Sequence, residues 1–501
     1  MFPLINKREN GVNLRRIMDM LGVATKDVEQ YSGFERGDKH MKLYHYRSID
    51  NAIKEIENRT FRYSDRLEVN DPLEGYIRVY WKGDRIAWEG LFRNYICSLW
   101  QCIAFYHMGI EYEEIEANAV IIDIHHFDNV PMGEIFKVIS TRFIENDYIQ
   151  KIMKYLDEKQ ISCSAKSLRM LLRLLHEIAF SICINKMKEE KLINDNQNEY
   201  VLATEKVLEE LINAETEQMS VEQMKVMFES AAIIVEDMIE SIFLMKGCET
   251  NTYSAQSQNW MKVRLDFPSV YVSKLQEIIY PKAYFVCFSS DNTNSAMWGN
   301  YADNHTGVCL IYQTRNVNGK ETLSVKSKVV YGNEKSFLFR DDEVKAVTYN
   351  HMAIQRNFFE SLGRLTYLQI ESWLVSGDEK KSELLERYLE EDWRNKYWVD
   401  YDEKYCMKLP AWKHEKEYRL LITDSFYEYT PEDRFIKYNQ EQLVGVIFGI
   451  KTSECDKFRI INALKKSDRN LDDFEFYQAE YDDEDQTIKV RGKYLFDKTI
   501  H

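Results

Sequence analysis

Four polar clusters in this chain combine residue types that are common in binding and catalytic sites. The clusters are His45 with Arg47, Asn70 and Asp71 with Glu74, Ser289 through His305, and Glu415 and Glu417 with Arg419. Carboxylate, imidazole and guanidinium groups can transfer protons, bind anions or coordinate metal ions. Each cluster lies in or beside a segment that is expected to form a β-strand, so we expect a sheet to position them.

The last cluster carries the strongest local signal. On an extended strand, Glu415, Glu417 and Arg419 point to the same face. Two like charges on one face repel each other, and an apolar Leu-Leu-Ile run comes directly after them. The pattern is compatible with a structural salt bridge or with a functional site, and both interpretations stay open.

Established catalytic motifs are absent from the sequence, which contains no GxGxxG, GxxxxGK[ST], HExxH or GxSxG. His125 and His126 lie near Asp123 and Asp128, but a metal site there needs a further ligand that the sequence does not identify. A Cys287–His305 catalytic pair is conceivable, although the apolar neighbours of the cysteine indicate burial. The sequence therefore predicts no metal centre at these histidines and cysteines.

Residues 283–312 are predicted to form a strand, a turn, a short helix, a second turn and a strand. Apolar runs at 284–288 and 308–312 read as strands, and Met297, Trp298 and Tyr301 recur at helical spacing. The turns hold exposed candidates for binding, which are Ser289, Asn292, Asp303, Asn304 and His305. Trp298 and Tyr301 can pack in the core and still present one edge to a ligand.

The remaining segments alternate between strand-rich and helix-rich sequence. Short strands and a helix are expected in 41–80, and helices in most of 84–280, with one strand at 119–124. Residues 340–398 are expected to be helical, with aromatic side chains in the core. The strands expected in 404–500 are EYRLLIT, LVGVIFGI and FEFYQAEYD, with a helix at about 453–465.

These elements predict an α+β fold with a mixed β-sheet built from both ends of the chain and a large inserted helical domain. Residues 1–40 are predicted to be an N-terminal helical arm. Residues 41–83 and 283–501 are predicted to form the mixed core domain, and residues 84–282 the inserted helical domain.

Composition narrows the class of protein. The 501 residues are 45% hydrophobic and 30% charged, with a net charge of −16. This charge argues against broad contact with nucleic-acid phosphates, although a local basic groove would still allow nucleic-acid binding. The sequence has no uninterrupted apolar run of about 18 residues and no secretion-signal pattern, so we expect a cytoplasmic protein without a membrane span. The nine scattered cysteines lack a CxxC pair and are expected to be buried free thiols.

Four motifs give the chain a family resemblance. The segments LYHYRS, VNDPLE, CFSS…MWGNYADNHTGVC and WKHEKEYR resemble a widespread bacterial family of unknown function, with the signature YxYRS, NDPxE, CFS…MWxxYxxxHxGxC and WxxExEYR. The resemblance covers 41–80 and 283–450. Members of that family are often encoded near bacterial defence genes, which implies an anti-phage effector or sensor with a phage-derived trigger.

A second resemblance implies a chemistry. The layout of residues 43–64 is similar to the opening of DarT-type and RNA 2′-phosphotransferase-type ADP-ribosyltransferases. In that case His45 would hold the nicotinamide-side ribose of NAD, Ser289 would pack the pocket, and Glu415 or Glu417 would stabilise the cationic sugar. Arg47 would meet the pyrophosphate. The remaining ligand-binding candidates are Asn70, Asp71, Glu74, Trp298, Tyr301, His305 and Arg419.

Two other functions remain open. The chain can be a non-catalytic module that binds a nucleotide or a phage protein and signals through the helical domain. It can also be a nuclease that holds Mg²⁺ with Asp71, Glu74, Glu415 and Glu417. The helical surfaces could additionally assemble the chain as a homo-oligomer or as a subunit of a defence complex. Convergence of the polar residues in space would indicate a site, whereas their dispersal would make them fold determinants.

Overall fold

The computed structural model describes residues 40–71, 73–127, 130–193, 221–250, 259–260, 262–331, 334–350, 354–424 and 429–492. By internal contacts the chain divides into residues 1–41 and 42–501. The helical arm predicted for 1–40 therefore lies almost wholly outside the described residues. All the helices and strands with described bounds belong to the second unit.

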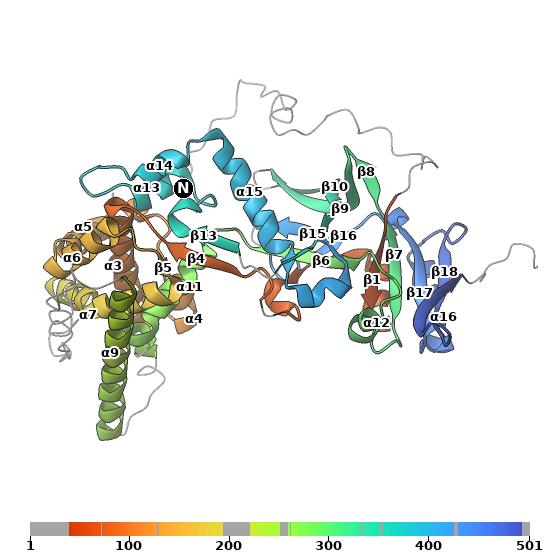
Figure 1. Ribbon diagram of the computed structural model, residues 1–501, viewed down its shortest axis with the longest axis horizontal. Coiled ribbons are helices and arrows are strands. Elements are labelled where there is room, and N and C mark those ends of the chain that lie inside the picture. Colours follow the sequence, from red (N-terminus) through yellow and green to blue (C-terminus); the bar gives the residue numbers. More distant parts are fainter. Residues whose placement is uncertain are drawn as a thin grey trace, which may run out of the picture. The chain divides into compact units, whose positions relative to one another are not determined.

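A mixed nine-stranded sheet positions most of the polar clusters (Figure 1). Its main path runs in the order β11-β15-β6-β1-β7-β17-β18-β19, and β3 pairs with β6 beside that path. The pairs are antiparallel except β17 with β18. The bounds are β1 Lys42–Arg47, β3 Ser64–Asp65, β6 Ala283–Ser289, β7 Val308–Gln313, β11 Lys345–Ala346, β15 Glu417–Thr423, β17 Leu443–Phe448, β18 Glu475–Asp482 and β19 Thr487–Gly492. Strands from both ends of the chain are neighbours, which confirms the α+β class and the mixed sheet.

The two faces of this sheet carry different side chains, because alternate residues of a strand point to opposite faces. In β1, His45 and Arg47 share one face, and Tyr44 and Tyr46 share the other. Tyr44 is opposite Ser289 in the antiparallel register, so Ser289 lies on the tyrosine face.

Each face is covered by a different helix. Helix α2 (Ile49–Asn58) covers the histidine face, because its Glu55 contacts the His45 side chain. Helix α16 (Glu454–Lys466) packs against α2. The short helix α12 (Ser295–Tyr301) covers the tyrosine face, where the Trp298 and Tyr46 rings meet edge to face. The strand, helix and strand predicted for 283–312 are confirmed as β6, α12 and β7.

Most of the helices pack around one large apolar core. Their bounds are α3 Arg85–His107, α4 Tyr112–Ala117, α5 Pro131–Ile144, α6 Asp147–Glu158, α7 Ala165–Glu189, α9 Val221–Thr250, a π-helix Lys262–Asp266 and α11 Phe267–Glu277. Three later helices, α13 Tyr367–Leu374, α14 Glu383–Arg387 and α15 Glu391–Tyr405, contribute to the same core. The expected core role of the aromatic residues in 358–398 is confirmed for those that are buried.

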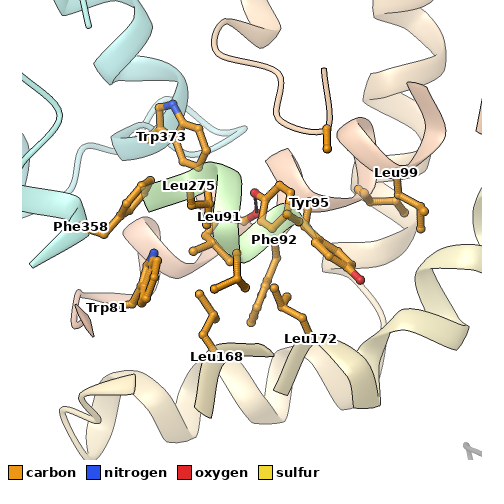
Figure 2. Packing of buried hydrophobic residues seen from close by; sticks show 14 of the residues in the cluster. Trp81, Leu91, Phe92, Tyr95, Leu99, Leu168, Leu172, Leu275, Phe358 and Trp373 are labelled. Carbon is orange, nitrogen blue, oxygen red and sulfur yellow. Dashed lines mark hydrogen bonds between the residues drawn. The ribbon is translucent and has the colours of Figure 1, made fainter. Parts of the chain in front are cut away.

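Figure 2 shows how α3 is enclosed in this core. Leu91 and Phe92 of α3 face α7, and Trp373 approaches from the other side. Gly90 permits that approach, because a Cβ atom there would lie 2.0 Å from the Trp373 carbonyl oxygen. The core therefore joins residues before and after the strand-rich 283–331 segment.

Two predicted elements differ from the structure. Residues 119–124 form no strand, because their backbone bonds to side chains of α3. Asn94 Nδ2 donates to the Ile121 carbonyl oxygen at 2.6 Å, and the Ile121 N–H donates to Ser98 Oγ at 3.0 Å. Much of 340–357 is strand rather than helix, including β13 (Ile354–Asn357), which pairs in parallel with β4 (Ile77–Trp81).

Small strands and 3₁₀-helices complete the described elements. The strands are β2 Thr60–Arg62, β5 Cys163–Ser164, β8 Arg315–Val317, β9 Lys320–Tyr331, β10 Glu334–Glu343, β12 Thr348–Tyr349, β14 Met407–Lys408 and β16 Phe435–Lys437. The 3₁₀-helices are Arg66–Glu68, Ile124–Phe127, Phe358–Glu360, Pro410–Glu415 and Gln440–Gln442. The parallel pair of β12 and β14 places Lys408 opposite Tyr349.

Candidate functional site

Five charged side chains interlock beside β15, and we call them the ionic network: Glu74, Lys408, Glu415, Glu417 and Arg419. Lys408 Nζ donates to Glu415 Oε2 and to Glu417 Oε2, both at 2.7 Å, and lies 3.5 Å from Glu74 Oε2. Arg419 Nε donates to Glu417 Oε1 at 2.6 Å, and its Nη1 lies 2.7 Å from Glu74 Oε1. Each carboxylate therefore touches at least one cation.

The ionic network is buried. Relative exposure is 2% for Glu74, 9% for Lys408, 2% for Glu415, 4% for Glu417 and 0% for Arg419. Such groups are rarely buried unless they are paired, and an ion pair inside a protein repays desolvation only with good geometry. Burial of all five in one place distinguishes this cluster from the surface ion pairs elsewhere on the chain.

The local backbone explains how the carboxylates converge. Strand β15 begins at Glu417, so alternation puts Glu417 and Arg419 on one face, opposite Ser289 and Cys287 of β6. The prediction that Glu415 shares this strand is wrong, because Glu415 ends the 3₁₀-helix before it. Lys416 is left-handed, with φ of 46°, and this turn brings the two glutamates together.

Sequence reasoning did not identify Lys408. A buried strand with two glutamates and one arginine indicates that a further cation is needed, and that charge imbalance is the only signal. Nothing local distinguishes Lys408 from Lys413 or Lys416, both of which are exposed. The choice depends on the pairing of β14 with β12, which is a contact distant in sequence.

Two polar side chains connect the ionic network to the surface. Tyr301, which is half-buried, donates its hydroxyl to Glu415 Oε1 at 2.6 Å. Asn70, which is exposed, donates its Nδ2 to the Tyr301 oxygen at 3.3 Å. The half-buried Trp412 adds an aromatic face at 5.4 Å from Lys408 Nζ. Asn70 and Tyr301 are therefore the accessible part of the site.

Ser289 and Asp71 hold backbone near the network. Ser289 Oγ donates to the Glu415 carbonyl oxygen at 2.7 Å and accepts from the Asp291 N–H at 3.0 Å. Asp71 Oδ1 accepts from the Leu73 N–H at 2.9 Å, and its carbonyl accepts from the Glu74 N–H at 3.0 Å. Both side chains are buried, so their role in the structure is to position Glu415 and Glu74.

Trp298 and His305 fix the turn around α12. Trp298 Nε1 donates to the Asn292 carbonyl oxygen at 2.9 Å, and its ring is fully buried. Asp303, Asn304 and His305 have φ values of 49°, 52° and 71°, a left-handed run that is uncommon for residues other than glycine. The His305 carbonyl oxygen accepts from the Lys451 N–H at 2.9 Å, which ties this turn to the segment before α16.

His45 and Arg47 belong to a second cluster on the opposite face of the sheet. His45 Nδ1 lies 3.0 Å from Glu55 Oε1, and Arg47 Nε donates to Glu55 Oε2 at 2.9 Å. Tyr312 donates its hydroxyl to Glu55 Oε1 at 2.8 Å. The structure thus unites Glu415 and Glu417 with Asn70, Glu74, Tyr301, Arg419 and the backbone-holding Ser289, but it does not bring His45 and Arg47 to them.

Burial and pairing set the proton affinities of the ionic network. Burial alone would raise the pKa of Glu417, but Arg419 and Lys408 lower it to about 2. Burial raises the pKa of Glu74 despite the neighbouring Arg419. The pKa of Lys408 rises above its usual range, because the nearby carboxylates outweigh the effect of burial. Burial and the Glu417 carboxylate raise the pKa of Cys287, so this thiol stays protonated.

The second cluster is also buried. Burial, reinforced by Arg47, lowers the pKa of His45, so the imidazole is neutral at pH 7. Burial alone would raise the pKa of Glu55, but contacts with His45, Arg47 and Tyr312 lower it to about 2. The His45 ring also packs 5.0 Å from the Phe288 ring between centroids. This arrangement anchors α2 to the sheet.

Metal ligation finds no support in the part of the chain that the structure describes, where no group of three or more histidine, cysteine, aspartate or glutamate side chains is arranged for it. Between Glu74, Glu415 and Glu417, the place of a cation is taken by Lys408 Nζ. The Asp123 side chain accepts from the His125 backbone N–H at 3.1 Å, and Asp128 lies outside the described residues.

Comparison with known proteins supports the resemblance to an uncharacterised family. Residues 297–420 match the model of a family described as "Protein of unknown function (DUF2971)". The matched segment contains Tyr301, Lys408, Glu415, Glu417 and Arg419. Searches of curated proteins and of solved structures return no match. None of the helices in the described part of the chain has the length and apolarity needed to span a bilayer.

Proposed function

We propose that this chain is a ligand-binding sensor in bacterial defence against phage, and that its ligand contacts Asn70 and Tyr301 above the ionic network. One observation carries the ligand-binding part of the proposal: charged and polar residues from the NDPxE, MWxxY and ExEYR motifs converge on a single buried network. The defence role rests on the family resemblance alone. Segments that are distant in sequence supply Glu74, Tyr301 and Arg419 to the network. Strongly perturbed pKa values cluster at functional sites, and Glu417 and Lys408 both have them.

The geometry favours binding over NAD-dependent transfer of ADP-ribose. In the resemblance described above the glutamate hydrogen-bonds a ribose hydroxyl, but Glu417 is buried and both of its oxygens already accept hydrogen bonds, one from Lys408 and one from Arg419. The resemblance also requires His45 in the same pocket, and the strand register puts that residue on the other face. A binding role requires neither rearrangement.

The contacts of Arg419 offer a route for the signal. Its Nη1 donates to the carbonyl oxygen of Tyr405, the last residue of α15. Tyr397, Tyr401 and Tyr405 of this helix are buried in the apolar core shared with α3 and α7. Ligand binding that shifts the ionic network would therefore move a helix that packs in the helical region. A phage-derived nucleotide or protein is the trigger class that this role implies, and partner subunits could read the helical surface.

A thermal-shift screen with a turnover assay tests the proposal. Purified protein is melted with nucleotides, NAD included, and with fractions from phage-infected cells, while release of nicotinamide from labelled NAD is followed in parallel. We expect a rise in melting temperature without nicotinamide release. The rise is expected to be lost in Glu417→Gln and kept in Glu480→Gln, an exposed carboxylate paired with Arg491.

The opposite results would refute the sensor role. Nicotinamide release that disappears in Glu417→Gln but persists in Glu480→Gln would establish NAD chemistry instead. Plaque counts on cells that express the natural chain or either variant add a second readout. Protection that is equal with Glu417→Gln and with the natural chain would separate the ionic network from any defence role.

A further inference from the structure

Helix α9 packs on the rest of the protein with one side of its surface. Its described buried residues are Ala231, Ala232 and Val235, and the partly buried Met227 and Met238 pack against the same large core. At about 100° per residue, these positions lie within less than half of the circumference of the helix. The other side of α9 is therefore not needed for packing against the core.

Two ion pairs fix how α9 lies on α7. Lys166 Nζ donates to Glu229 Oε2 at 3.0 Å, and Arg173 Nη2 donates to Glu236 Oε1 at 3.4 Å. Both pairs join residues that are 63 positions apart in the sequence, so the two helices run parallel. The edge of α9 that carries Glu229 and Glu236 is thus occupied by α7.

Apolar side chains are exposed on the remaining side of α9, and we call four of them the apolar stripe. Val226, Ile233, Ile234 and Leu244 have relative exposures of 57%, 48%, 59% and 53%. The spacing from Val226 to Ile233 is about two turns and that from Ile233 to Leu244 is about three turns, so these residues form one line of about 27 Å. A surface helix normally turns its polar residues outward. Contiguous apolar exposure instead indicates an interaction surface.

Two carboxylates interrupt the apolar stripe. Asp237 and Glu240 follow Ile233 on the same side of the helix, and both are exposed. The ion pairs of α9 in the described part of the chain are those of Glu229 and Glu236. A purely apolar partner would bury the charges of Asp237 and Glu240 without compensation, which is costly. A partner with lysine or arginine at these positions would pair with them.

A second copy of the chain fits this face poorly. Parallel pairing of two α9 helices would put Asp237 against the same residue of the second copy, and like charges repel each other. Antiparallel pairing that places Val226 against Leu244 would put Asp237 against Ile233. Either arrangement leaves carboxylates in the interface without a cation, which is strongly unfavourable.

We infer that the exposed side of α9 binds a basic amphipathic helix of another protein. The apolar residues of that helix would meet the apolar stripe, and its lysine or arginine side chains would pair with Asp237 and Glu240. Recognition of an amphipathic helix through its apolar side is a recurring mode of protein binding. The inference goes beyond the proposed function, because it concerns α9 and does not depend on the ionic network.

Two helical peptides of about 18 residues, which match the length of the apolar stripe, test the inference. Both carry leucines at the spacing of the stripe, and the central polar positions are lysines in one peptide and glutamines in its twin. Binding of the fluorescein-labelled peptides to the full chain is measured by anisotropy. We expect the lysine peptide to bind about fivefold or more tightly than its twin, as two partly exposed ion pairs allow. Equal binding, or no binding of the lysine peptide, would overturn the inference.

A pair of matched variants localises the charge effect. Asp237→Asn combined with Glu240→Gln is expected to abolish the preference for the lysine peptide. The control combines Glu383→Gln with Glu386→Gln on α14, where two exposed carboxylates have the same spacing of three residues. The control changes the net charge equally, so it should keep the preference. Loss of the preference in both double variants would assign it to the overall charge of the chain and contradict the inference.

The apolar contact is tested in the same assay. Ile233→Gln should weaken the binding of both peptides by about tenfold or more, since it removes a large apolar side chain from the contact. Phe458→Gln on α16 removes an equally exposed apolar side chain from another helix and should leave binding unchanged. Circular dichroism and melting curves confirm that each variant is folded. Unchanged binding by folded Ile233→Gln would refute docking on α9.

Light scattering of the full chain tests the competing occupant. A dimer that Ile233→Gln converts into a monomer would assign this face to a second copy and overturn the inference. A monomer, or a dimer that Ile233→Gln leaves intact, keeps the face open for the partner helix, as we infer. Failure of the peptide test removes this interface and leaves the sensor proposal standing, whereas failure of the ligand screen removes the sensor role and leaves this interface.

Discussion

Replacement of Lys408 by methionine tests whether the ionic network is held together as described. Methionine keeps most of the length and removes the charge. The variant leaves Glu415 and Glu417 each without a 2.7 Å donor, and it removes the 3.5 Å neighbour of Glu74. Arg419 then remains as the cation of the network, facing three carboxylates.

The expected loss of folding free energy in Lys408→Met results from the burial of the ionic network. At an effective dielectric constant of about 20, one contact of this length contributes roughly 6 kcal/mol of attraction. Removal of the ammonium also ends its own desolvation penalty, which is several kcal/mol, so the net loss is smaller than the sum of the contacts. Loss of one partner from a buried pair typically costs about 3–5 kcal/mol, and we expect a value in this range at pH 8.

This cost should decrease at lower pH. In the natural chain the pKa of Glu417 is about 2, below its value in the unfolded chain, so its stabilising contribution is present above about pH 4.5 and lost toward pH 2. Without Lys408 the pKa of Glu417 rises in the folded state. The folded variant then takes up a proton at a higher pH than the natural chain does, so its loss of stability decreases as the pH falls through this raised pKa, by at most about 1.4 kcal/mol per pH unit.

Urea unfolding followed by tryptophan fluorescence measures the cost at pH 8 and pH 5. The double variant with Glu415→Gln should recover about 1 kcal/mol or more, because it removes one unpaired carboxylate. A loss below about 1 kcal/mol that is equal at pH 8 and pH 5 would indicate an ordinary surface pair. That result would refute the buried network and the functional argument built on it.

Three further outcomes are expected. Gly90→Ala should destabilise the folded protein by about 3 kcal/mol or more, because the new Cβ atom would clash with a carbonyl oxygen of α13. The control Gly299→Ala should not lower the melting temperature, because its Cβ atom would meet no atom within 4 Å. Glu55→Gln should cost about 2–3 kcal/mol at pH 7 in urea unfolding, and this cost should vanish as the pH falls toward the pKa of Glu55, about 2. Tyr301→Phe should cost about 1–3 kcal/mol by leaving a buried carboxylate oxygen unbonded, while Tyr481→Phe, which is exposed, should be neutral by the same assay.

Local patterns predicted much of the sheet. The apolar runs at 284–288 and 308–312 form β6 and β7, and the EYRLLIT segment forms β15. These strands could be predicted because the pattern that indicates a strand lies within a few neighbouring residues. The strand predicted for the apolar residues at 119–124 is wrong for the opposite reason. Their backbone groups bond to Asn94 and Ser98 of a helix, and that contact depends on packing between distant segments.

The site was only partly predictable for a similar reason. Residue types and spacing identified Glu74, Glu415, Glu417 and Arg419, which meet in the ionic network, and Tyr301, which contacts Glu415. The face of the sheet on which His45 lies depends on the register of β1 against β6, and a shift of one residue exchanges the two faces. No local signal gives that register, so the sequence could not separate His45 from the ionic network.

The register also explains why the LYHYRS motif supports the site on one face of the sheet and holds α2 on the other. In β1, Tyr46 donates its hydroxyl to the Asp291 carbonyl oxygen at 2.7 Å and packs on Trp298, which supports α12 and therefore Tyr301. The adjacent His45 contacts Glu55 and holds α2 on the opposite face. Substitution of His45 should then act through stability alone, whereas substitution at the ionic network should change both stability and ligand binding. A single strand between the two faces thus couples the support of the site to the packing of α2.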